Sequence, residues 1–196
     1  MMSLHNPLFH RIGWGLAALV TLGAGWLLLQ SRYGDAAVLF GFVTVAVAIG
    51  SWKDRVPALF TLLFGVVALI NAAGYIFDLW NSPWWFDEFV HVITPFAMMG
   101  ALAWLIIERD MANPTSNGPT YFAKILFVGL LIGFAWEGFE YVVGIVGDRR
   151  DTVIDLVADG IGSLLGAGFC LWAARVGPDD PEHDGTRRGG NSSARG

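Results

Sequence analysis

Most of this chain is divided into long apolar blocks, and each block is long enough to cross a lipid bilayer as a helix. A transmembrane helix needs about 20 consecutive, mostly apolar residues. Glycines, prolines and charged residues, which usually form loops, are concentrated between the blocks. Six blocks can be drawn, over residues 8–29, 36–50, 56–77, 89–107, 122–143 and 153–174. We therefore predict an all-α polytopic membrane protein, a bundle of about six transmembrane helices.

The composition agrees with a membrane domain. Hydrophobic residues make up 55% of the chain and charged residues only 15%, which is too apolar for a soluble domain. We expect one transmembrane domain over residues 1–176 and a disordered cytoplasmic tail over residues 177–196, rich in Gly, Pro, Ser and charges. The first block is longer than a signal-peptide core and lacks a cleavage site, so we expect it to be retained. The sequence has no stripe of basic residues, so a nucleic-acid partner is not predicted.

The distribution of Lys and Arg predicts how the helices are oriented. If the N-terminus is cytoplasmic, nine of the 12 Lys and Arg residues lie in inner segments and three in outer segments. Because inner loops of membrane proteins are enriched in these residues, both termini are predicted to be cytoplasmic. We expect a multi-pass protein of the cytoplasmic membrane, with membrane lipids as its immediate partners.

Titratable residues gather near the predicted outer ends of the last three blocks. A charged group at membrane depth is unfavourable unless it is paired, hydrated or bound to a cation. The inner halves of the blocks contain almost nothing ionisable. We therefore predict an acidic, metal-binding site that faces the outer leaflet. Its candidate ligands are Asp87, His91, Glu137, Glu140, Asp151, Asp155 and Asp159.

Two of these pairs are spaced to share one helix face. Asp87 and His91 are four residues apart, and Glu137 and Glu140 are three apart. Two carboxylates so close cannot both stay charged in a poorly hydrated place without a cation. The alternatives are that His91 is an interfacial histidine reaching towards water, and that the glutamates face an aqueous vestibule.

The last block carries a stripe of acids followed by small residues. Asp151, Asp155 and Asp159 repeat every four residues, and Gly162 and Gly166 continue the stripe. Asp151 can simply complement the helix dipole, but Asp159 lies two turns inside the helix. Spaced glycines let a second helix approach closely, so the acids are expected to face protein.

The ligand types restrict the cation without identifying it. Oxygen-rich ligation with one imidazole suits Mg²⁺, Mn²⁺, Fe²⁺ or Zn²⁺. An open watery cleft, shared protons or the nearby Arg149 and Arg150 are other ways to compensate the acids. The only cysteine, Cys170, lies in an apolar run and is not expected to bind metal. No organic cofactor is evident.

The stretch from residue 86 to residue 168 resembles the YjdF-like family of uncharacterised bacterial inner-membrane proteins and, more distantly, the VanZ-like family. VanZ-like sequences typically have Gln at Glu140 and Asn at Asp159, so this site is more acidic. The resemblance implies an inner-membrane location, and for the VanZ-like group a link to glycopeptide-antibiotic resistance and the cell envelope. The matching residues are Asp87-x-x-x-His91, Glu137-x-x-Glu140, Arg149 with Arg150, Asp155-x-x-x-Asp159 and Gly162-x-x-x-Gly166.

Three functions fit these patterns. The first is a metal-assisted enzyme acting on a lipid-linked or cell-envelope substrate, with Glu137 and His91 catalytic and Arg149 or Arg150 meeting an anionic head group. The second is an ion- or proton-coupled transporter, which the apolar inner halves disfavour. The third is a non-catalytic accessory or assembly protein with a membrane-protein partner. The sequence leaves open whether the protein is an enzyme.

Overall fold

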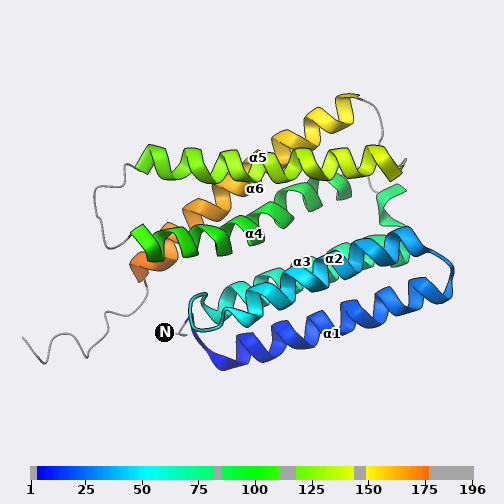
Figure 1. The fold of residues 1–196 in the computed structure, drawn as a ribbon, viewed down its shortest axis with the longest axis horizontal. Coiled ribbons are helices and arrows are strands. Elements are labelled where there is room, and N and C mark those ends of the chain that lie inside the picture. The colour runs from blue at the N-terminus through cyan, green and yellow to red at the C-terminus, as the bar shows by residue number, and fades with distance from the viewer. Residues whose placement is uncertain (1–3, 82–84, 111–117, 144–148, 177–196) are drawn as a thin grey trace, which may run out of the picture.

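All the regular secondary structure in the part of the chain that the structure describes is helical (Figure 1). The structure is a computed structural model, and it describes residues 4–81, 85–110, 118–143 and 149–176. The helices are α1 (Pro7–Leu29), α2 (Tyr33–Ser51), α3 (Ala58–Phe77), the short 3₁₀ helix η1 (Leu79–Asn81), α4 (Phe86–Asp110), α5 (Gly118–Val143) and α6 (Arg149–Val176).

The six α-helices are each long and apolar enough to cross a membrane, which confirms the predicted fold class. Four of them, α2, α4, α5 and α6, begin three or four residues earlier than the apolar blocks indicate. The first turns of α2, α4 and α6 contain acids, among them Asp35, Asp87 and Asp151. Acids stabilise a helix N-terminus, so a criterion based on apolarity places these helix starts too late. The predicted disordered tail lies outside the described residues, and the orientation stays a prediction.

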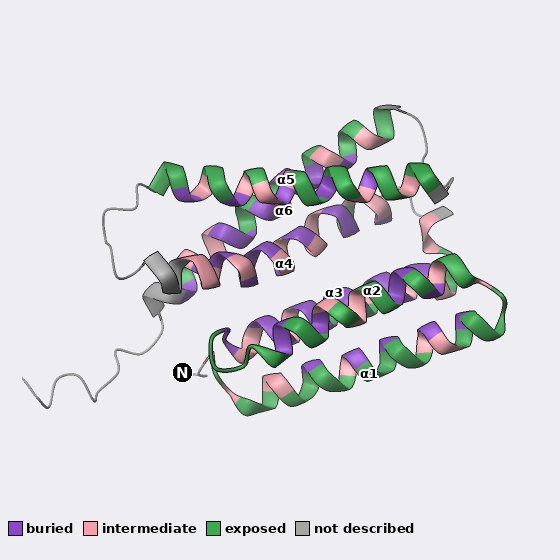
Figure 2. Ribbon diagram, viewed as in Figure 1, coloured by how far each residue is buried: buried purple, intermediate pink, exposed green. Residues whose placement is uncertain are grey.

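The helices form two groups of three (Figure 1). α1, α2 and α3 pack together in one group, and α4, α5 and α6 form the other, with α3 packed against α4 between them. Phe60 and Phe64 of α3 are fully buried with Leu27 and Leu39, whereas the outer faces of α1 and α5 are largely exposed (Figure 2). Exposed apolar faces are expected where helices contact lipid instead of water.

The closest helix pair is α4 with α6, which share the most extensive contact in the fold. A Cβ atom at Gly162 would overlap the backbone carbonyl oxygen of Val92, and one at Gly166 would overlap that of Phe96. The two glycines therefore let the backbones of α4 and α6 touch. This confirms the predicted seam and identifies α4 as the helix that approaches it.

Candidate metal centre

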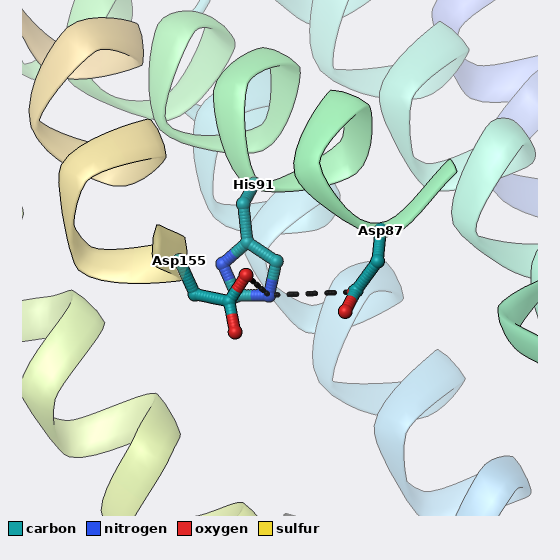
Figure 3. Close-up of side chains that lie close together, drawn as sticks. All are labelled: Asp87, His91 and Asp155. Atoms are coloured by element: carbon teal, nitrogen blue, oxygen red, sulfur yellow. Dashed lines mark ion pairs between the residues drawn. The ribbon is translucent and has the colours of Figure 1, made fainter. Parts of the chain in front are cut away.

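His91 lies at the middle of a group of carboxylates between α4 and α6 (Figure 3). Its side chain is 8% exposed, and its Nδ1 atom lies 3.1 Å from Oδ1 of Asp159. Because a carboxylate only accepts hydrogen bonds, Nδ1 carries the proton and donates it to Asp159. The other ring nitrogen, Nε2, lies 3.7 Å from Oδ1 of Asp87 and 4.0 Å from Oδ1 of Asp155. Nε2 therefore faces two carboxylates, and when it carries no proton its lone pair is open to a cation.

This geometry fits a divalent cation between three ligands. One ligand atom from each of Asp87, His91 and Asp155 lies within 4.8 Å of the other two. Ligands at about 2.1 Å from a shared ion are separated from one another by about 3–4 Å. Separations of 3.7 and 4.0 Å are too long for hydrogen bonds but suit such an ion. Metal-binding histidines usually donate their second nitrogen to a carboxylate, as His91 does to Asp159.

Local helix geometry positions each of these side chains. Asp87 and His91 are one turn apart on α4, and Pro95, one turn further, lies inside the helix. A proline has no N–H to donate to the carbonyl of His91. On α6, Asp155 and Asp159 are only 3% and 4% exposed because the glycine seam holds this face of α6 against α4.

α5 contributes a buried carboxylate beside the same group. Glu137 is 7% exposed, and its Oε1 atom has no hydrogen-bond partner within the described part of the chain. The Thr152 hydroxyl donates a hydrogen bond to the Glu137 side chain, which also interacts electrostatically with His91, Asp155 and Asp159. A buried acceptor left without a donor is costly, so this oxygen indicates a ligand such as water or a cation.

A glycine on α5 makes room for the centre. A Cβ atom at Gly133 would overlap a carboxylate oxygen of Asp159. The absence of a side chain at Gly133 therefore lets Asp159 lie directly against the backbone of α5 while it holds His91.

The remaining predicted residues are not among the three converging ligands. Glu140 is partly buried and lines a cavity together with His91 and Asp159. Asp151 and Arg150 are exposed at the start of α6, and Asp151 is not one of the three converging ligands. The side chain of Arg149 lies outside the described residues. The roles assigned to these residues stay predictions.

Sequence reasoning missed the cavity beside the metal centre. It has a volume of about 410 Å³ and lies between α2, α3, α4 and α5. Asn71 of α3 lines it and donates a hydrogen bond to the Thr94 hydroxyl of α4 at 3.2 Å. An amide within an apolar block was the available signal, because polar residues at membrane depth usually face the protein interior.

Comparison with known proteins identifies one family. A family described as "Predicted membrane protein (DUF2238)" matches residues 12–175 of the chain. This range covers most of α1, nearly all of the other five membrane-spanning helices and every residue of the metal centre. No curated protein and no solved structure matches the chain.

Proposed function

The chain belongs to the DUF2238 family of predicted membrane proteins, and from this premise we propose that it is a metal-dependent membrane enzyme. Its substrate would be lipid-linked or part of the cell envelope. The observation that carries the proposal is His91, held by Asp159 through one nitrogen and facing Asp87 and Asp155 with the other. Three protein ligands leave coordination positions for water and substrate, as in catalytic zinc sites.

The residues around the centre suit the activation of water. A divalent cation can polarise a phosphoryl or acyl oxygen and lower the pKa of bound water. Glu137 is a buried carboxylate, and one of its oxygens has no partner in the described part of the chain, so it can accept the proton that such a water loses. Arg150 is exposed at the start of α6, and we propose that it contacts an anionic head group near the membrane surface.

The resemblance to the YjdF-like family of inner-membrane proteins supports a finer proposal about location. We place the protein in the bacterial inner membrane with the metal centre towards the outer leaflet. The excess of Lys and Arg in the opposite segments supports this orientation, and so does the position of the centre near the start of α4 and α6.

A structural role for the cation is the second candidate. All three converging ligands come from α4 and α6, the most extensively packed pair of helices. A cation at this place would tie the two helices together whether or not chemistry follows. The catalytic role is favoured by two features that a structural tie does not need. One is Oε1 of Glu137 on α5, which has no hydrogen-bond partner among the described residues, and the other is the adjoining cavity.

Substitution of Glu137 by glutamine separates the two roles. The protein is reconstituted into vesicles of a bacterial lipid extract with Mg²⁺, Mn²⁺ or Zn²⁺, and the lipids are followed by mass spectrometry. We expect wild type to convert one lipid class, and Glu137→Gln to do so about 10²–10⁴-fold more slowly, as expected on loss of a general base. The variant should still bind the cation. A wild type that binds cation stoichiometrically, converts no lipid and melts at lower temperature without cation would support the structural role instead.

Asp159 is expected to act through His91. Asp159→Asn should weaken cation binding about 10–100-fold, the usual effect of losing a carboxylate that orients a metal-binding histidine. Titration calorimetry of chelator-stripped protein in detergent measures this change. Asp151→Asn is the matched control, because Asp151 is on the same helix but exposed. Equal affinities in the two variants would contradict the orienting role.

A further inference from the structure

The cavity beside the metal centre separates the two groups of helices along one side. α2 and α5 form its two walls, and side chains of α3 and α4 form its floor. Its volume of about 410 Å³ is within the range of about 300–1,000 Å³ that small-molecule sites occupy. The lining is mostly apolar and includes Phe42, Phe64, Val90, Met98 and Ile132.

The mouth of the cavity lies at membrane depth. Gly41 on α2 and Ile132 on α5 are exposed, whereas Phe64 and Pro95 on the floor are buried. All four belong to membrane-spanning helices, and Gly41 and Ile132 are near the middle of theirs. At this depth the surroundings are hydrocarbon. A molecule that enters between α2 and α5 therefore comes from the lipid phase.

Polar groups are restricted to a few positions in the lining. His91 and Asp159 of the metal centre line the cavity together with Glu140. Trp80 also lines the cavity, and within the described chain its indole N–H is a buried donor without an acceptor. Such a donor is suited to an oxygen of a bound molecule. The cavity thus combines an apolar body with groups that recognise an oxygen-bearing head.

We propose that this cavity binds one hydrocarbon chain of a membrane lipid, which enters sideways between α2 and α5. The oxygen-bearing head of the lipid lies beside His91 and Asp159, next to the proposed cation. The position of the lipid head rests on the proposed function, but the binding of the lipid's hydrocarbon chain does not require a cation. A helix of a partner protein, about 10 Å wide, is too large for this volume.

Gly41 offers a way to close the cavity without disturbing the fold. No atom lies within 4 Å of a Cβ atom built at Gly41, so a larger side chain there meets no backbone and occupies the mouth. Gly15 on α1 is a matched control, because it also has open space around it and does not line the cavity. Gly41→Phe and Gly15→Phe therefore add the same ring to the lipid-facing surface at different places.

The test uses photochemical labelling in vesicles. The probe is a phosphatidylethanolamine with a diazirine on one acyl chain, and labelled residues are mapped by mass spectrometry. We expect preferential labelling of Phe42 and Met98 in wild type and in Gly15→Phe. In Gly41→Phe this labelling should fall at least about fivefold, because the ring fills the entrance of a site of this size. Melting curves of both variants show that each is folded.

The outcomes separate this proposal from the proposed function. Labelling of Phe42 and Met98 no stronger than that of the lipid-facing Leu22 on α1 would overturn it. So would equal labelling in folded Gly41→Phe and Gly15→Phe. Asp155→Ala should lose the cation and keep the labelling. Cavity-specific labelling in a wild-type protein that binds no cation would leave the lipid site standing and remove the metal-dependent enzyme.

Discussion

Replacing Asp155 by alanine is expected to abolish stoichiometric binding of a divalent cation. The Asp155 carboxylate is buried, and its Oδ1 atom faces Nε2 of His91 across 4.0 Å. Loss of an orienting carboxylate alone weakens metal sites about 10–100-fold, so loss of a direct ligand should exceed 100-fold. Elemental analysis of protein after gel filtration measures the effect as metal atoms per chain.

The control for this experiment is Asp151→Ala. Asp151 precedes Asp155 by one turn on α6 but is exposed and is not one of the converging ligands. We expect Asp151→Ala to retain the metal content of wild type. If both variants retain it equally, the cation does not lie between His91 and Asp155.

Replacing Gly162 by leucine is expected to cause the largest loss of stability of any single substitution in the seam. The new side chain would overlap the backbone carbonyl oxygen of Val92, which cannot move aside as a flexible side chain can. Overpacking costs about 1–3 kcal/mol where side chains rearrange, and we expect the upper end of this range or more. The α4 and α6 helices would separate, and Asp155 and Asp159 would no longer reach His91.

Thermal unfolding in detergent, followed by circular dichroism, tests this prediction. Gly168→Leu is the matched control, because Gly168 is also in α6 and nothing lies within 4 Å of a Cβ atom there. We expect Gly168→Leu to melt near the wild-type temperature and Gly162→Leu well below it, with its cation binding lost. Equal melting temperatures would show that the glycine seam does not hold the two helices together.

The helices were predictable because each one leaves a local pattern in the sequence. Apolar length located all six. Four starts were placed too late, where the first turn holds an acid such as Asp35 or Asp151 or, in α5, the pair Gly118-Pro119. The spacing of Gly162 and Gly166 predicted a close helix contact. It could not name α4 as the partner, because periodicity describes one helix at a time.

The site was predictable as a set of residues but not as an arrangement. Spacing placed Asp87 and His91 on one face, yet it gave no reason for Asp159 to hold one ring nitrogen while Asp155 faces the other. That division depends on how far α6 is shifted along α4. The exposure of Asp151 likewise depends on where α6 leaves the helix bundle.

The cavity between α2 and α5 could not be predicted because it results from two helices that do not pack together. Gly41 and Ile132 are far apart in the sequence, and neither carries a motif. Only the tertiary arrangement brings them to opposite sides of one opening. On α3, the buried amide of Asn71 was the available signal in the sequence.

Anomalous diffraction from crystals grown with Mn²⁺ or Zn²⁺ tests the shared cation most directly. The predicted result is an anomalous peak at about 2.0–2.2 Å from Nε2 of His91 and from a carboxylate oxygen of both Asp87 and Asp155. The contradicting result is no peak at this place under saturating cation, with Nε2 of His91 hydrogen-bonded directly to one of the two carboxylates.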